Sequence, residues 1–396
     1  MGLTNLSISV IVPVHNGGEA FRCCLTALTR WASHWQEHRK REAAYAGSMA
    51  GSSIQSERLA RSRMTNLDRL TDKSDGWDNR GAGNVEIIVV SDGESDGSWR
   101  LAEAFGVRLI RLPVSGGPAK ARNIGAKSAR GDILFFVDAD VEIHSDTLSK
   151  VVASFEADAD LAALIGSYDD LPGAPNFLSQ YRNLIHHYTH QRSGLEISTF
   201  WGACGAVRRS IFEQVGGFDE GYRKPCIEDI ELGYRLKYAG HRIHLRPDIQ
   251  VKHLKRWTPI SMLRADIFYR ALPWTDLLMQ VQRARPAFHQ RFMQELNLKW
   301  SSRLSVVLVF GLVLSGAIAS ISGGLLASWQ LASWAGVAAL VCGLGLLLLN
   351  LPVYRFFQQR RGWIFAAKTV PWHWLYFFYS GLVYAYVSTR YRLRSG

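Results

Sequence analysis

From Leu304 to Tyr354 the chain runs for 51 consecutive residues without an Asp, Glu, Lys, Arg or His. A membrane-spanning helix needs roughly 20 predominantly apolar residues, and it must satisfy its own backbone hydrogen bonds. The stretch therefore has room for two spans with a turn within residues 322–333. A buried helical hairpin of a soluble protein would need a large additional core. We expect residues 304–354 to form a transmembrane helical hairpin that follows a separate domain of about 250 residues.

Residues 355–396 start with a basic loop and continue into an apolar run, residues 370–388, that is dense in aromatic side chains. The positive charges of the loop, which favour the cytoplasmic side of a membrane, are Arg355, Arg360, Arg361 and Lys368. If the apolar run crossed the membrane, Arg390, Arg392 and Arg394 would lie outside. An interfacial or re-entrant segment is therefore favoured for residues 370–388, and a third membrane span is the alternative. We expect an integral membrane protein, of a bacterial inner membrane, with a cytoplasmic N-terminal domain.

The segment before the hairpin, residues 251–303, carries ten Lys or Arg against three acidic residues. Aromatic residues such as Trp274 and Trp300 are interleaved with these charges. The composition predicts basic amphipathic helices lying on an anionic leaflet. Nucleic acid is the other partner that a basic aromatic segment can indicate, but a position directly before a membrane hairpin argues against it. Pro273 and Pro286 predict a break into two or three short helices.

Residues 1–250 alternate strand-like and helical segments, with polar residues after each strand. The strand-like segments are residues 7–14, 85–90 and 133–137, and helical segments are expected from about residue 19 to 34 and from Pro118. This order is typical of a parallel α/β sheet, which binds ligands outside the carboxyl ends of its strands. Asp138 and Asp140 stand at such an end. Carboxylates in this arrangement can hold Mg²⁺ or Mn²⁺, whose other positions suit diphosphate oxygens.

These segments, followed by residues 199–209, 216–220 and 228–232, resemble in order the family-2 glycosyltransferases of GT-A fold, over roughly residues 7–257. The resemblance implies a Rossmann-like nucleotide-diphospho-sugar transferase domain that inverts the anomeric carbon. Such a transfer needs a cation to offset the charge of the leaving diphosphate and a base for the acceptor proton. Asp229, with Glu228, opens a helix and is the predicted catalytic base, kept ionised by the helix dipole. Simple capping of that helix is the alternative explanation.

Other site residues follow from the same resemblance. Asp92 is expected to bind the nucleobase, although Ser91 stands where the family usually has a further acid. The predicted donor-binding residues are Pro13, Val14, Asn16, Asp92, Lys120, Arg122, Asp138, Arg256 and Trp257. The predicted metal ligands are Asp138, Asp140 and His253, and the predicted acceptor-side residues are Trp201, Gly202 and Cys204. Arg256-Trp257 also resembles the Arg-Trp motif of processive polysaccharide synthases, and Trp257 could equally anchor the chain at a lipid interface.

The sequence thus predicts a membrane-bound, inverting glycosyltransferase that uses a nucleotide sugar, with a UDP-sugar favoured. Its expected acceptor is a lipid or lipid-linked molecule at the cytoplasmic leaflet. A processive polysaccharide synthase and a non-catalytic nucleotide-binding scaffold are the alternatives. Residues 36–84 form a predicted mobile insertion, and the five cysteines lack disulfide or zinc spacing and are expected to be reduced.

Overall fold

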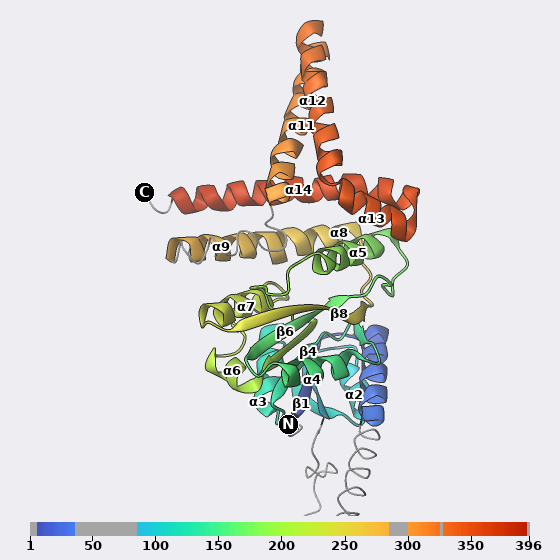
Figure 1. The fold of residues 1–396 in the computed structure, drawn as a ribbon, viewed down its shortest axis with the longest axis vertical. Helices are drawn as coiled ribbons and strands as arrows, with labels where there is room; N and C mark the ends of the chain where they lie inside the picture. Colours follow the sequence, from blue (N-terminus) through green and yellow to red (C-terminus); the bar gives the residue numbers. More distant parts are fainter. Residues whose placement is uncertain (1–5, 36–84, 285–299, 325–327, 394–396) are drawn as a thin grey trace, which may run out of the picture.

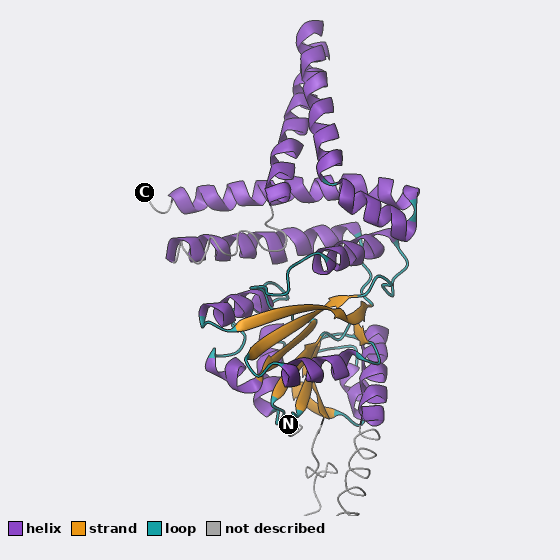
Figure 2. Ribbon diagram, in the orientation of Figure 1, coloured by secondary structure: helices purple, strands orange, loops and turns teal. Residues whose placement is uncertain are grey.

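The computed structural model describes residues 6–35, 85–284, 300–324 and 328–393. The predicted insertion, residues 36–84, lies outside the described residues. An eight-stranded sheet forms the centre of the N-terminal domain (Figure 2). Its strands, in chain order, are β1 (Ile8–Val14), β2 (Val85–Asp92), β3 (Arg108–Leu112), β4 (Ile133–Val137), β5 (Val141–Ile143), β6 (Leu161–Tyr168), β7 (Cys204–Arg208) and β8 (Arg242–His253).

The sheet is mixed rather than parallel, which corrects the expectation from sequence. In space the strands follow the order β3-β2-β1-β4-β7-β6-β8-β5. β1, β2, β3 and β4 run parallel, whereas β7 is antiparallel to both β4 and β6, and β5 is antiparallel to β8. Alternating strand-like and helical segments indicate parallel crossovers, but the long excursion between β6 and β7 returns the chain in the opposite direction.

Helices cover both sides of this sheet (Figure 1). The first occupies residues 18–35. Those that follow within the domain are α2 (Ser98–Ala104), α3 (Pro118–Ser128), α4 (Thr147–Ala157), α5 (Phe177–Gln191), α6 (Arg209–Gln214) and α7 (Glu228–Tyr238). Pro118 occupies the first turn of α3 as expected, because its fixed φ suits that position and its missing N–H is not needed there.

The C-terminal helices form a second assembly above the domain in Figure 1. They are α8 (Pro259–Arg264), the π-helix η1 (Ala265–Ala271), α9 (Leu272–Ala284), α11 (Trp300–Gly324), α12 (Trp329–Leu349), α13 (Leu351–Arg361) and α14 (Trp363–Leu393). α11 and α12 form a hairpin that projects away from the sheet, and α9 and α14 lie across its base. At 25 and 21 residues, α11 and α12 are each long and apolar enough to span a membrane, since 25 residues rise about 37 Å.

Pro273 does not break the juxtamembrane region as expected. Residues 259–284 are helical throughout, and Pro273 is the second residue of α9. A proline inside an α-helix clashes with the carbonyl four residues before it. Here η1 immediately precedes α9, and a π-turn changes the hydrogen-bond spacing at that point. We attribute the continuity of the helix to this altered spacing. Pro286 lies outside the described residues.

The two assemblies are joined by polar contacts of α13. Arg360 pairs with Asp170 at 2.7 Å, and Arg361 donates to the Asp170 carbonyl at 2.6 Å and to Gln180 Oε1 at 3.0 Å. Two of the four basic residues that predicted a cytoplasmic loop, Arg360 and Arg361, thus bind the N-terminal domain directly. At the other end of the assembly Arg390 of α14 pairs with Asp276 of α9. α14 is therefore tied to α9 near its C-terminal end as well.

Candidate active site

The two acids after β4 lie at the edge of the sheet with partly exposed side chains, 34% for Asp138 and 31% for Asp140. Pairing of β5 with β8 brings His253 beside them, since His253 is the register partner of Val141. His253 Nε2 lies 3.9 Å from Asp140 Oδ2, and Lys255 Nζ lies 3.8 Å from the same oxygen. The three residues predicted as metal ligands, Asp138, Asp140 and His253, thus lie near one another in the structure.

The imidazole of His253 is held in its neutral form. Burial is the main cause that lowers its pKa, to about 3, and the charge of Lys255 adds to this. The ring stacks on Tyr168 with centroids 4.3 Å apart. Neutral imidazole is the form that binds metals.

The residues present suit a hard divalent cation only in part. Asp138 and Asp140 offer carboxylate oxygens, the ligands that Mg²⁺ and Mn²⁺ prefer. Among the described residues, however, there is no group of three or more His, Cys, Asp or Glu arranged to hold a metal. A cation here would therefore need oxygens of the donor diphosphate to complete its coordination, as Mg²⁺ often does.

Arg122 occupies a different position from that of the predicted donor ligand. Its guanidinium is only 4% exposed and bridges two carboxylates, with Nη2 2.7 Å from Asp138 Oδ1 and Nη1 2.8 Å from Glu228 Oε1. Gly202 makes room for it, because a Cβ there would lie 2.9 Å from the guanidinium carbon. Arg122 thus connects the acids after β4 to the start of α7.

Glu228 is likewise part of this buried link rather than an exposed catalytic group. Its second oxygen accepts a hydrogen bond from the Cys226 amide at 2.8 Å, so both carboxylate oxygens have internal partners. We infer that Glu228 positions its neighbour, Asp229, instead of contacting substrate.

Asp229 has the surroundings of a base that titrates near neutrality. Its Oδ2 accepts from the Gly202 amide at 3.1 Å and its Oδ1 from the Ile230 amide at 2.8 Å. Burial raises its pKa to about 6, helped by the charge of Glu228, while Arg122 acts in the opposite direction. Burial thus acts against the helix dipole that was expected to keep this carboxylate ionised, although with a pKa of about 6 the carboxylate is still the main form at neutral pH.

Asp229 lines a cavity of about 490 Å³ between the N-terminal domain and the C-terminal helices. Trp201 lines it as well, with its ring against Tyr168 at 4.7 Å and His186 at 4.8 Å. Cys204, by contrast, is a core residue. It is fully buried in β7 and burial raises its thiol pKa to about 12, so it does not face an acceptor.

At the other end of the site, Asp92 organises a loop. Its carboxylate accepts from Ser115 Oγ at 2.8 Å and from the amides of Gly116 and Gly117 at 2.7 and 2.9 Å. Three of the usual four acceptor positions of a carboxylate are thus occupied and Asp92 is only 4% exposed, so its contact with a nucleobase stays a prediction. Asn16 is also engaged, since its side-chain oxygen accepts from the Ser95 amide at 2.8 Å.

The remaining predicted donor residues differ in exposure. Lys120 in α3 and Arg256 are exposed, whereas the Val14 side chain is buried and Pro13 is half-buried within β1. Trp257 is 8% exposed and packs in a cluster with Met262, Phe357 and residues of α5. A ring buried in that cluster neither anchors at a lipid surface nor stacks on an acceptor sugar, which removes the main support for a processive synthase.

Three features of the cavity escaped prediction. Arg270 lines it from η1, inside a segment recognised only by its overall charge. His186 Nδ1 is buried without a partner among the described residues. Asp266 is buried, forms an ion pair with Arg182 at 2.5 Å and accepts a hydrogen bond from the Tyr379 hydroxyl at 2.7 Å. No local sequence signal joins these residues, because they come from α5, η1 and α14.

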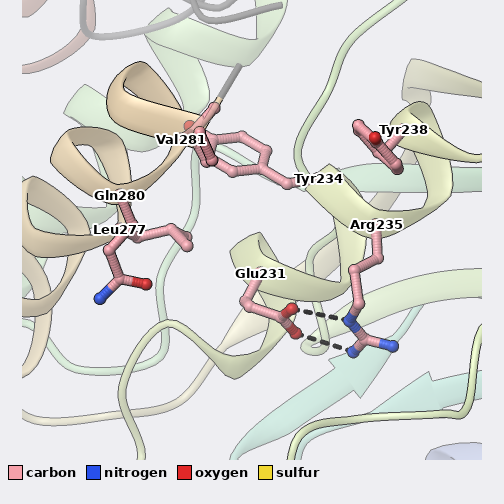
Figure 3. Close-up of a pocket in the computed structure, with 8 residues that line it drawn as sticks. Glu231, Tyr234, Arg235, Tyr238, Leu277, Gln280 and Val281 are labelled. Atoms are coloured by element: carbon pink, nitrogen blue, oxygen red, sulfur yellow. Dashed lines mark hydrogen bonds and ion pairs between the residues drawn. The ribbon is translucent and has the colours of Figure 1, made fainter.

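α7, the helix that carries Glu228 and Asp229, packs against α9. Tyr234 of α7 accepts a hydrogen bond from Trp274 Nε1 at 2.9 Å and packs with Leu278. Figure 3 shows the neighbouring groove, in which Glu231 and Arg235 of α7 form an ion pair at 2.6 Å opposite Leu277 of α9. α7 is thus held between the sheet and the juxtamembrane helix.

Comparison with known proteins gives consistent results. Residues 68–216 match the model described as Glycosyl transferase family 2, and residues 182–258 match that of the N-terminal domain of galactosyltransferase. The chain is 29% identical over 177 residues to the probable glycosyltransferase YdaM of Bacillus subtilis, covering 41% of each protein. It is 28% identical over 198 residues to the pre-mycofactocin glycosyltransferase of Mycobacterium tuberculosis, covering 47% of this chain and 41% of that one. The chain thus spans about two fifths of the length of these relatives.

Among solved structures, the chain resembles the mannosyltransferase PcManGT from Pyrobaculum calidifontis, in complex with GDP-Man and Mn²⁺. The TM-score is 0.51 with 16% sequence identity, over 96% of this chain and 86% of that one. The fold is that of the GT-A glycosyltransferases. More specifically, the chain carries a family-2 glycosyltransferase domain, as predicted, followed by C-terminal helices of which two are apolar enough to span a membrane.

Proposed function

We propose that this protein is a membrane-bound, metal-dependent, inverting glycosyltransferase that moves a sugar from a nucleotide diphosphate to a lipid or lipid-linked acceptor. The observation that carries the proposal is the link Asp138–Arg122–Glu228, which connects the acids after β4 to the start of α7, where Asp229 follows Glu228. Carboxylates from two distant parts of the sequence, Asp138 after β4 and Glu228 with Asp229 at the start of α7, are thereby brought to one edge of the sheet.

The donor would bind at the ends of β1, β2 and β4, with Lys120 exposed nearby for its phosphates. Asp138 and Asp140, with the neutral imidazole of His253, would hold Mg²⁺ or Mn²⁺. The cation would supply charge stabilisation for the departing diphosphate. The solved neighbour with GDP-Man and Mn²⁺ supports such chemistry for this fold.

Asp229 would remove the proton of an acceptor hydroxyl as the glycosidic bond forms. A base is most effective when its pKa lies near the working pH, and a pKa of about 6 meets that condition. Gly202 and Ile230, through their amides, hold the carboxylate in place for this step.

The C-terminal helices support a location at a membrane. Only 11% of the most apolar stretch of each hairpin helix is buried within the protein. Trp300 at the start of α11 and Trp363 at the start of α14 are exposed, and tryptophans favour a membrane–water interface. α14 lies across the base of the hairpin, as an interfacial segment would. An acceptor dissolved in the leaflet would then meet the cavity that contains Asp229.

The test is transfer of label in membranes. Membranes carrying the wild-type chain or Asp140→Ala are incubated with labelled UDP-, GDP- and dTDP-sugars and Mg²⁺ or Mn²⁺, and lipids are extracted and identified by mass spectrometry. We expect a labelled lipid with one donor, lost in Asp140→Ala and on adding EDTA. Wild-type protein that neither hydrolyses nor transfers from any of these donors would leave the non-catalytic scaffold as the better account.

A further inference from the structure

The cavity that contains Asp229 connects the catalytic residue with the membrane end of the molecule. On the domain side it is lined by Thr199, Trp201 and Asp229, and on the other side by Ser301 at the start of α11 and Asn350 at the end of α12. A single molecule of amphiphilic shape could therefore touch both the base and the foot of the hairpin.

The charges of this cavity favour an anion. Its lining holds three arginines, Arg182, Arg192 and Arg270, against two acids, Asp229 and Asp266. Arg182 is neutralised by its ion pair with Asp266, and the Arg192 guanidinium lies 4.9 Å from the Tyr188 ring centroid.

Arg270 is the cation left to receive a ligand. Its side chain is exposed, and it has no hydrogen bond or ion pair among the described residues. It projects from η1, and π-turns are frequent at functional sites. Its charge reaches the catalytic carboxylate, since Arg270 is among the groups that act on Asp229.

We propose that this cavity binds the acceptor as a phosphate-bearing lipid, with Arg270 holding the phosphate while Asp229 receives the proton of a separate hydroxyl on the same headgroup. The inference rests on the proposed function and names its acceptor class. The hydroxyl oxygen forms the bond to the anomeric carbon, and its proton passes to Asp229. The bond to the diphosphate breaks, and the nucleoside diphosphate leaves with the electron pair.

This acceptor differs from two simpler ones. A diacylglycerol offers the hydroxyl but gives Arg270 no anion to bind. A polyprenyl phosphate offers an ionised oxygen as its own nucleophile and does not need a base with the surroundings of Asp229. Only a headgroup that carries both groups uses both residues.

The experiment uses the full chain in phosphatidylcholine vesicles. Lipids extracted from its native membranes are separated by anion exchange into neutral and anionic fractions, and each is supplied with labelled donor. We expect label only with the anionic fraction, in a product stable to mild acid, since glycosyl phosphates are cleaved under those conditions. Transfer at an equal rate to the neutral fraction, or an acid-labile product, overturns the inference.

Variants test the residue. We expect Arg270→Gln to raise the KM for the anionic lipid at least tenfold with a smaller change in kcat. Arg270→Lys, which keeps the positive charge, should give a KM between those of the wild type and Arg270→Gln. Arg264→Gln, which removes an exposed arginine of α8 that does not line the cavity, serves as the matched control and should leave KM unchanged. Equal KM values for the two glutamine variants also contradict the inference.

The two proposals can fail separately. If the wild-type chain hydrolyses a nucleotide sugar but neither lipid fraction accepts the sugar, the acceptor inference is wrong while donor chemistry stands. If the wild-type chain turns over no donor at all, the proposed function itself is wrong.

Discussion

At the scale of single residues, the site depends on one buried arginine that serves two acids. Arg122 holds Asp138 at one end and Glu228 at the other, and Glu228 in turn raises the pKa of Asp229. The chemistry of the base is therefore tied to the side that faces the donor. A change at Glu228 should alter the pH dependence of the reaction without removing any group that contacts substrate.

The first prediction concerns that pH dependence. The active form of Asp229 is the carboxylate, so kcat/KM should rise as the pH increases through about 6. Glu228→Gln removes the negative neighbour that raises the pKa, and the acidic limb should move to lower pH. Glu231→Gln, in the same helix but paired with Arg235, should leave the limb in place. Initial rates measured between about pH 4 and pH 8, about two units either side of the limb, test this shift.

The second prediction concerns stability. Arg122→Met leaves the buried Glu228 and the partly exposed Asp138 without their partner, which should destabilise the domain by roughly 3–5 kcal/mol. Arg22→Met removes an exposed arginine of the pair with Glu19 and should change stability by less than about 0.5 kcal/mol. Thermal or urea unfolding in detergent compares the two. Similar losses in both variants would show that the buried link contributes little.

At the scale of secondary-structure elements, the close contact between α7 and the segment before Trp201 positions the base. A Cβ on Gly233 would lie 2.2 Å from the Phe200 amide nitrogen and 2.7 Å from the Ser198 carbonyl oxygen. Only a glycine lets the helix approach this closely. The same contact sets the distance between Asp229 and the Gly202 amide.

Gly233→Ala should therefore lower kcat by roughly 10- to 100-fold, as expected for a misplacement of about 1 Å. Gly194→Ala is the control, because a Cβ there comes no nearer than 3.9 Å to its surroundings. Rates are measured with the same donor and acceptor at saturation. An unchanged kcat in Gly233→Ala would mean that α7 shifts without moving the base.

The sequence predicted those parts of the fold and site that depend on local pattern. Strands with polar ends, Asp138 and Asp140, and the start of α7 at Glu228 were all visible as short motifs. The roles of Arg122 and Cys204 were not, because they depend on contacts across the sheet: Arg122 meets Glu228 over 106 residues of chain. Trp257 belongs to a recognisable Arg-Trp motif. Its burial, however, depends on packing against α13 and α14, which follow it by about a hundred residues of sequence.

At the scale of the whole molecule, α7, α9 and α14 form successive layers (Figure 1). α7 packs on α9 through Tyr234 and Leu278, and α9 is tied to α14 through Asp276 and Arg390. A second connection runs through α13 and Asp170. The position of the domain relative to the hairpin is thus fixed at both ends.

The fourth prediction tests the second connection. Reversing one charge, as Arg360→Glu or Asp170→Arg, should reduce sugar transfer to lipid relative to donor hydrolysis, and the double reversal should restore it. The coupling should be about 0.5–1 kcal/mol at most, since Arg360 is partly exposed to solvent. Three variants and the wild type, assayed in vesicles, form the cycle. Additive losses in the double reversal would contradict a direct role for the pair.

The cavity that contains Asp229 is walled in part by the ends of the hairpin helices. For a substrate that reaches this wall by diffusing within the leaflet, the concentration that matters is the amount per unit of membrane area and not per unit of volume. The velocity should then follow the mole fraction of acceptor in the bilayer. Adding inert phospholipid to a fixed quantity of acceptor should slow the enzyme, whereas diluting the whole suspension with buffer should not change the turnover of each protein molecule.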